Sequence, residues 1–308
     1  MARYILKRFI AGILSLFVLI TLTFFLMRVI PGGPFSPEKY RKTPEAVLEL
    51  IKGQYGLNDP VYIQYGRYLG NIAHGNLGIS FVKLNYSVNS LIGNGAPVSA
   101  RVGFFAILAA LCIGIPLGTT AAVKRGHLAD GISMVIATLG VSMPSFVLCV
   151  LLMYLFCGKF KLLPSFGLKT WQSYILPVTC LAFGQIANIT RLMRSSMLET
   201  LNQDYIRTER SKGIPEFVVI AKYAMKNSIL PVITYLGPMA ASLMTGTFIV
   251  EKIFSIPGIG RYFVNAISDR DYSVTLGLTI FYGAMIIICN MLVDIVYALI
   301  DPRIKIDE

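Results

Sequence analysis

Polar side chains recur at helical spacing inside long apolar stretches of this sequence. Gln185, Asn188 and Arg191 follow one another every three residues, and Asn290 and Asp294 lie one helical turn apart. In a membrane, an unsatisfied amide or charge costs several kcal/mol, so such side chains must face other helices, a partner chain or water. The first set predicts either the lining of a polar pathway or hydrogen bonds between helices, with Arg191 reaching towards the cytoplasm. For Asp294, the sequence favours an ion pair with Arg or Lys over ion binding.

The residues of this sequence that could take part in catalysis do not occur in a known catalytic motif. The Gly158–Lys159 pair lacks the upstream glycine and the Ser or Thr of a phosphate-binding loop, and no Ser lies within G-x-S-x-G. His74 and His127 are predicted on opposite sides of the membrane, which excludes a metal or acid–base site shared by them. The isolated cysteines are predicted to pack as small apolar residues. We therefore predict no catalytic residue, no metal site and no cofactor bound by this chain.

The composition indicates a membrane protein. Apolar residues make up 55% of the 308 residues and charged residues only 14%, whereas roughly a quarter of the residues of a soluble protein are charged. Runs of about 20 apolar residues, each long enough to cross a bilayer as a helix, recur along the chain. We predict an all-α polytopic protein with six transmembrane helices: Phe9–Ile30, Val98–Val123, Gly131–Phe156, Tyr174–Met193, Ile229–Val250 and Ser273–Ile300.

The net charge of +12 is best explained as an orientation signal. Basic residues are more frequent before the first span, after the second and fourth spans and at the C-terminus than in the short opposite loops. By the positive-inside rule, both termini are predicted to be cytoplasmic. Nucleic-acid binding is disfavoured because the basic residues form no aromatic-interleaved patch. A cleaved signal peptide is disfavoured because the first apolar run is too long.

The spans divide the chain into four parts. Residues 1–30 form the N-terminal end and first span, and 31–97 form an extracytoplasmic loop. Residues 98–300 form a five-span core with a cytoplasmic loop at 194–228, and 301–308 form a cytoplasmic tail. Pro-to-Gly segments in the extracytoplasmic loop predict two short helices, in PEAVLELIKGQYG and DPVYIQYGRYLGNIAHG.

Prolines and small residues shape the predicted spans. Kinks or helix starts are expected at Pro116, Pro144, Pro177, Pro231 and Pro238. The fifth span carries small residues at intervals of four, which serve either close helix packing or a moving gate. These residues are Gly237, Ala241 and Thr245.

The cytoplasmic loop contains a patterned polar segment between Asp204 and Pro231. DYIRTERSKG predicts a short helix that ends near Gly213, a position for left-handed backbone or close approach. Pro215 is predicted to begin a second helix. From the pattern alone, the segment is either a docking surface or a solvated helix pair at the membrane surface. The predicted apolar face of the second helix consists of Phe217, Ile220, Tyr223 and Ala224.

This segment resembles the loop, often called the EAA loop, that permease subunits of binding-protein-dependent ABC importers insert into a cleft on their ATPases. It is similar to the form in the oligopeptide and dipeptide permease family, R-T-A-R-A-K-G followed later by L-P. Glu209 stands where Ala is usual and Tyr223 where His is common, which implies a contact adjusted to a particular ATPase subunit. The resemblance assigns ATPase coupling to this segment: Arg207, Thr208, Glu209, Gly213, Pro215, Tyr223, Leu230 and Pro231.

The resemblance covers nearly the whole chain and is to the B-type subunit. The stretches that carry it are RYILKRF, LNDPVYIQYGRYL, HGNLGISF, FSIPGIGRYFVNAISDRDY and VDIVYALIDPRIK. It implies the type I ABC importer permease fold in a bacterial inner membrane, with alternating access as the mechanism. It further implies a homologous second permease, two ATPase subunits that bind ATP and Mg, and an extracytoplasmic peptide-binding protein. IPGGPFSPEK favours oligopeptides over dipeptides or nickel.

Two alternatives come from other functional classes. An ion-coupled transporter would need inverted repeats and ionisable groups in discontinuous helices at mid-membrane depth, and neither is evident. A membrane enzyme or scaffold could hold a partner with a similar loop, but an enzyme needs an acidic or Ser/His pair within the bundle. Only the face with Asn290 and Asp294 is available for that. We therefore predict a permease subunit for oligopeptides, embedded in the lipid bilayer and without a nucleic-acid partner.

Overall fold

The computed structural model describes residues 2–29, 45–82 and 86–300. These residues form helices and connecting turns, with an antiparallel bridge between Ile79 and Ser87, in agreement with the predicted all-α class. The opening of the predicted extracytoplasmic loop at 31–44 and the predicted tail at 301–308 lie outside the described residues. The long helices are α1 (Ala2–Val29), α4 (Val88–Val123), α7 (Gln172–Leu201), α11 (Leu230–Met244) and α14 (Tyr272–Ile300).

Among the described residues, five segments are long and apolar enough to cross a membrane, or six if one bent helix pair counts as a span. The bent pair replaces the predicted continuous span Gly131–Phe156. It consists of α5 (Leu128–Ser142), then α6 (Ser145–Met153) and the π turn η1 (Tyr154–Lys159), with a bend of 104°. Met143 has extended backbone because the ring of Pro144 disfavours the helical conformation in the residue before it. The sequence predicts a break at this proline but not its size.

Other boundaries also differ from prediction. α4 begins at Val88 rather than Val98, because the Ser87 hydroxyl caps its first turn and the bundle accommodates Pro97 inside the helix. The predicted fifth span consists of α11 and α12 (Phe248–Ile253). They are separated near Gly246, which has a φ of 83°.

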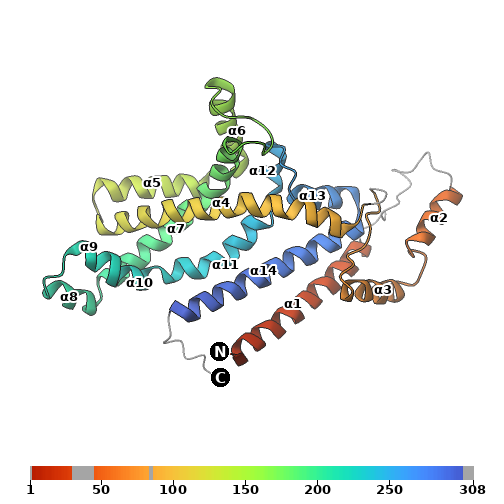
Figure 1. Ribbon diagram of the computed structural model, residues 1–308, viewed down its shortest axis with the longest axis horizontal. Helices are drawn as coiled ribbons and strands as arrows, with labels where there is room; N and C mark the ends of the chain where they lie inside the picture. Colours follow the sequence, from red (N-terminus) through yellow and green to blue (C-terminus); the bar gives the residue numbers. More distant parts are fainter. Residues whose placement is uncertain (1, 30–44, 83–85, 301–308) are drawn as a thin grey trace.

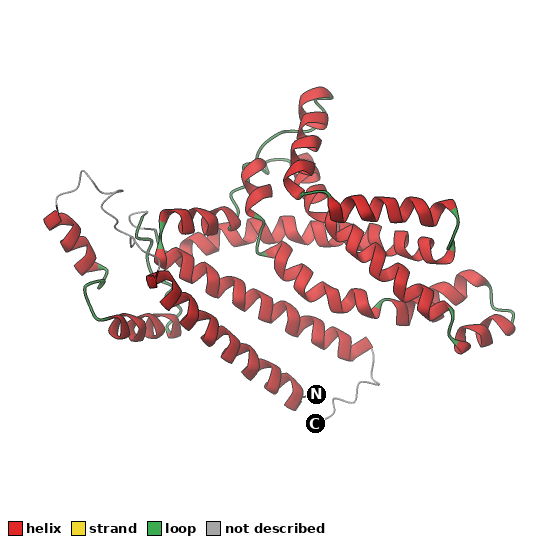
Figure 2. Cartoon of the chain, turned by 180° about the vertical axis from the view of Figure 1, so that it is seen from behind, coloured by secondary structure: helices red, strands yellow, loops and turns green. Residues whose placement is uncertain are grey.

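The helices form an elongated bundle (Figure 1). α4, α5 and α7 pack together, α11 packs on α14, and α1 lies along α14. One end of the bundle carries the short helices α8 (Asp204–Ser211), α9 (Glu216–Val218) and α10 (Met225–Ser228). The start of α1 and the end of α14 point to that side, as the reverse view also shows (Figure 2). The other end carries the two short helices predicted in the loop, α2 (Glu45–Gln54) and α3 (Val61–Ala73), together with α13 (Gly260–Asp269).

Small residues allow the long helices to approach closely. A Cβ atom at Gly118 of α4 would lie 2.6 Å from both the Met193 Cβ and the Thr190 carbonyl oxygen of α7. A Cβ at Gly237 of α11 would lie 2.6 Å from the Asn290 side-chain oxygen of α14. Because a larger residue would separate these pairs, glycine sets the interhelical distance. The predicted small-residue stripe therefore serves helix packing at Gly237.

Candidate functional site

The predicted coupling segment, defined here as Asp204–Ser228, forms a helical hairpin at one end of the bundle (Figure 1). Asp204 lies in the first turn of α8, where a negative charge is favourable. Gly213 follows the end of α8 with a φ of 75°, the left-handed conformation that the sequence predicts there. Pro215 directly precedes α9, which begins the second arm at Glu216.

Buried apolar side chains anchor the coupling segment to the bundle. Ile206 of α8 is fully buried, as are Val219 and Ala224 of the π turn η2 (Val219–Ala224). They share one core cluster with Met193 and Met197 of α7. Since apolar burial on both arms stabilises the hairpin against α7, the coupling segment is a firmly attached extension of the bundle.

The predicted apolar face of the second arm is wrong at one position. Phe217 is 80% exposed, whereas Val219, which was not predicted, is buried. Ile220 and Tyr223 are partly buried against the core and Ala224 is fully buried. The π turn η2 causes the difference, because its wider winding shifts the buried face away from the 3.6-residue period. An aromatic side chain is therefore left exposed on the hairpin.

One ion pair closes the hairpin, and a second lies at the end of its first arm. Arg210 donates hydrogen bonds of 2.6 and 3.0 Å to the two carboxylate oxygens of Glu216, across the Gly213 turn. Lys212 pairs with Glu209 at 2.7 Å. The hydrogen bond from Arg210 lowers the pKa of Glu216, and the hydrogen bond to Glu209 raises the pKa of Lys212. Both pairs thus favour the charged forms at neutral pH.

The other residues that match the family pattern lie on α8 or at the start of α11. Arg207 is exposed, with its guanidinium 3.7 Å from the Asp204 carboxylate. The Thr208 hydroxyl donates to the Asp204 carbonyl at 3.1 Å. Leu230 and Pro231 are the first two residues of α11, which follows α10 almost directly. All residues assigned to coupling therefore lie on the hairpin or on its connection to α11.

The polar face of α7 makes hydrogen bonds to α11. The Tyr235 hydroxyl donates to the Gln185 side-chain oxygen at 2.7 Å and accepts from the Asn188 amide at 3.0 Å. Of the two roles predicted for this face, hydrogen bonding between helices is present in the structure. The lining of a pathway stays a prediction. Tyr235 was not identified from the sequence as the partner of Gln185 and Asn188, because a tyrosine in an apolar span is usually taken as a packing residue. Its hydroxyl, which needs a hydrogen-bond partner when buried, was the available signal.

The two arginines on α7 reach α5. Arg191 donates to the Thr138 hydroxyl at 3.1 Å, and its Nε is buried without a partner. Thr138 lies about two turns further along α5 than Asp130, so the Arg191 side chain is directed away from the end of the bundle that carries the coupling segment. Arg194 pairs with Asp130 through contacts of 2.6 and 2.8 Å. This pair was not predicted from the sequence. An acidic residue at the start of an apolar span, Asp130, was a signal that a basic partner is needed, although not of which one.

Asp294 pairs with Arg8, with 3.1 Å between carboxylate and guanidinium. This contact joins α14 to α1 and is the kind of pairing that the sequence favours. Asn290, one turn away, packs over Gly237. Both predicted polar residues of α14 are thus placed at helix contacts.

Besides Asp130, two more buried carboxylates were not predicted. Glu251 of α12 accepts hydrogen bonds from the Ser99 hydroxyl at 2.6 Å and from the Arg261 backbone at 3.1 Å. Asp271 accepts hydrogen bonds from the Ser80 hydroxyl and from the backbone amides of Phe81 and Val82. Each carboxylate holds a glycine-containing loop, within FSIPGIGRYF or HGNLGISF, against the bundle. Within the described ranges, no group of three His, Cys, Asp or Glu residues is placed to hold a metal ion.

Sequence comparisons relate the whole chain to one group of proteins. The model of the family described as "Binding-protein-dependent transport system inner membrane component" matches residues 114–306. The corresponding N-terminal family model matches residues 1–88. The chain is 47% identical over 311 aligned positions to the dipeptide transport system permease protein DppB of Bacillus subtilis, covering 100% of this chain and 99% of the relative. It is 43% identical to the oligopeptide transport system permease protein OppB of Haemophilus influenzae, covering 99% and 100%.

Solved structures share the fold at low sequence identity. A chain of the MetNI methionine ABC transporter in an inward-facing conformation has a TM-score of 0.56 and 16% identity, covering 68% of this chain and 96% of that chain. A chain of an amino acid ABC transporter determined with histidines has a TM-score of 0.55 and 14% identity, covering 68% and 94%. These likenesses agree with the predicted type I ABC importer permease fold. The full-length relatives and the matched family models establish that this chain belongs to the binding-protein-dependent transport system inner membrane components.

Proposed function

We propose that this chain is a transmembrane permease subunit of an ABC importer, which moves oligopeptides from an external binding protein into the cytoplasm. Full-length relatives named as oligopeptide and dipeptide permeases support peptides as the substrate class. Oligopeptides are the main proposal, and dipeptides are the second candidate because a DppB protein is among these relatives. ATP and Mg bind to the partner ATPase subunits, and a second homologous permease completes the pathway.

The observation that carries this proposal is the anchored hairpin of the coupling segment. It exposes an aromatic ring at Phe217 and charged side chains, while its inner face is fixed to the core by Ile206 and Val219. A short turn joins α7 to α8, and α10 leads into α11. A force applied to the hairpin by an ATPase therefore reaches α7 and α11, which carry the polar contacts around Tyr235.

The orientation follows from the same surface. ATPases that hydrolyse cytoplasmic ATP must meet the coupling segment in the cytoplasm. Because the start of α1 and the end of α14 lie towards that end of the bundle (Figure 1), both termini are assigned to the cytoplasm. The outer loop and the FSIPGIGRYF segment then face the binding protein as its docking rim.

The test is uptake of a labelled oligopeptide into proteoliposomes that contain all partners, with copurification of the ATPases. Gly213→Glu places a side chain at a left-handed position with open space around it, so the change acts on the hairpin surface and turn. Gly126→Glu is the matched control, since Gly126 has a φ of 78° and open space in the α4–α5 turn. We expect only Gly213→Glu to lose uptake and ATPase association while the chain stays folded.

Two outcomes contradict the proposal. Persistence of uptake and association in Gly213→Glu removes the coupling assignment, and equal loss in Gly126→Glu shows that the effect is not specific to the hairpin. Vanadate, which traps ATPases, should stop uptake in the wild type, whereas an uncoupler alone should not. The reverse result would favour ion-coupled transport.

A further inference from the structure

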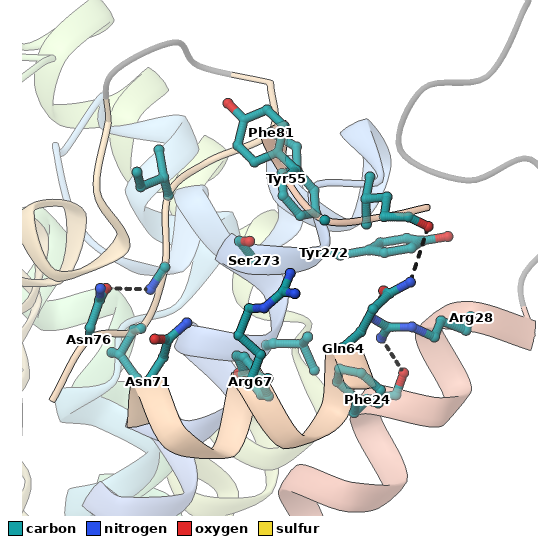
Figure 3. A pocket seen from close by; sticks show the side chains of 17 residues that line it. Phe24, Arg28, Tyr55, Gln64, Arg67, Asn71, Asn76, Phe81, Tyr272 and Ser273 are labelled. Atoms are coloured by element: carbon teal, nitrogen blue, oxygen red, sulfur yellow. Dashed lines mark hydrogen bonds between the residues drawn. The ribbon is translucent and has the colours of Figure 1, made fainter. Parts of the chain in front are cut away.

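A cavity of about 270 Å³, lined by both polar and apolar side chains (Figure 3), lies at the end of the bundle opposite the coupling segment, where α3 is found (Figure 1). Its walls come from the last turns of α1, from α3 and from the first residues of α14, together with the segments around Tyr55 and Phe81. Arg67 extends from α3 towards its centre, and Arg28 borders it from α1. The cavity belongs to neither the coupling segment nor the polar face of α7.

The charge of Arg28 is not neutralised within the described part of the chain. Its guanidinium lies 3.4 Å from the centre of the Phe24 ring, donates to the Phe24 carbonyl at 3.1 Å and donates to the Gln64 side-chain oxygen at 2.7 Å. These acceptors are uncharged. A guanidinium has five N–H groups, so donors of Arg28 remain available to a ligand. By contrast, Arg67 is already paired with Asp59 at 2.7 Å.

The remaining polar groups also favour an acceptor as ligand. The Gln64 amide is fully used, since its nitrogen donates to the Leu57 and Asp59 carbonyls at 3.1 and 2.7 Å. The Tyr68 hydroxyl is buried and has no hydrogen-bond partner. Burial raises the pKa of Tyr68, so this hydroxyl remains a donor. A cavity with unused donors on a guanidinium and a phenol fits an oxyanion.

The position of the cavity indicates the source of that anion. Arg28 is in the last turn of a membrane-spanning helix, Leu6–Val29, and therefore lies at headgroup depth. On the side of α1 that carries Arg28, large apolar side chains are also exposed, including Phe17 and Phe25, which are 47% and 44% exposed. A phosphate at Arg28 would thus have an apolar helix surface beside it for acyl chains.

We propose that this cavity binds the phosphate of an anionic phospholipid headgroup, with Arg28 and Tyr68 as its donors. The uncompensated positive charge of Arg28 favours a headgroup with net negative charge over a zwitterionic one, whose ammonium group would be repelled. Bound lipid would join α1 to α3 and α14 at the membrane surface. The proposal is independent of peptide transport.

The test is native mass spectrometry of the purified full-length chain titrated with phosphatidylglycerol or phosphatidylcholine. We expect the wild type to bind phosphatidylglycerol about tenfold more tightly, and Arg28→Gln to lose this preference, since one charge-assisted hydrogen bond corresponds to about that ratio. Tyr68→Phe should weaken phosphatidylglycerol binding without lowering the melting temperature, because the hydroxyl has no partner within the protein. Arg261→Gln, at the same end but outside the cavity, is the matched control and should bind as the wild type does.

Three results would overturn the proposal. One is an unchanged lipid preference in Arg28→Gln, and another is unchanged phosphatidylglycerol binding in Tyr68→Phe. The third distinguishes the sources of phosphate. If inorganic phosphate binds to the wild type and not to Arg28→Gln, while the two lipids bind equally, the occupant is a free anion rather than a lipid headgroup.

Discussion

The carboxylate of Asp130 in α5 and the guanidinium of Arg194 in α7 form a two-point ion pair, with Nε to Oδ1 at 2.6 Å and Nη2 to Oδ2 at 2.8 Å. The Asp130 side chain is only 10% exposed. The same carboxylate accepts a hydrogen bond from the Gly126 backbone at 3.1 Å, which fixes the α4–α5 turn. The pair therefore ties α4 and α5 to the part of α7 that leads into the coupling segment.

Removing one partner of this pair should destabilise the protein strongly. Asp130→Asn leaves a partly buried guanidinium without its counter-charge, and we expect a loss of about 3 kcal/mol in unfolding free energy. Arg194→Lys should lose part of the stability, because an ammonium group cannot make the parallel two-point contact. Thermal unfolding of the purified chain measures both. Exchange of the two charges, Asp130→Arg with Arg194→Asp, should recover part of the loss, and equal stability of Asp130→Asn and wild type would refute this role.

Phe217 should contribute to ATPase association without contributing to folding. Its ring is 80% exposed, so Phe217→Ala should leave the melting temperature unchanged. An aromatic anchor of an interface contributes about 2 kcal/mol or more, which corresponds to roughly thirtyfold weaker binding. The measurement is titration of reconstituted permease with the ATPase subunits. Phe166→Ala is the control, since Phe166 is 63% exposed but lies outside the hairpin; equal effects of the two variants would contradict the prediction.

The Arg210–Glu216 contact should make the hairpin sensitive to acid. The pKa of Glu216 is lowered in the folded protein by its hydrogen bond from Arg210. Its contribution is therefore complete above the ordinary glutamate pKa and is lost as the pH falls through the lowered folded value. The effect should be at most about 1 kcal/mol, because both side chains are exposed to solvent and screened by it.

A comparison with Glu216→Gln isolates this effect. The stability difference between wild type and variant should be present at neutral pH and disappear in acid, while the variant itself lacks this part of the pH dependence. Thermal unfolding across a pH series measures it. A difference that stays constant into acid would show that the Glu216 carboxylate is not what stabilises the hairpin.

Sequence patterns anticipated the elements better than their contacts. Apolar runs locate the spans because lipid enforces helices over that length, and Gly213 and Pro215 mark the hairpin because their backbone preferences are local. The size of the bend at Pro144 and the buried face around Val219 were not predictable, since they depend on a broken span and a π turn. Ion pairs such as Asp130 with Arg194 join distant segments, and a single sequence carries no signal for which acid meets which base.

The hydrogen bonds of Tyr235 separate the two roles predicted for the polar face of α7. Tyr235→Phe removes one hydroxyl and leaves the Gln185 oxygen and the Asn188 amide without this partner. If the face holds helices together, the unfolding free energy should fall by about 1 kcal/mol, the typical scale of such hydrogen bonds. Peptide uptake per folded importer should then remain near the wild-type rate, and Tyr62→Phe, at a 74% exposed tyrosine on α3, should change neither quantity. We expect this outcome because both polar groups are already engaged between α7 and α11. Unchanged stability with a large loss of uptake would instead place Gln185 and Asn188 in the peptide pathway.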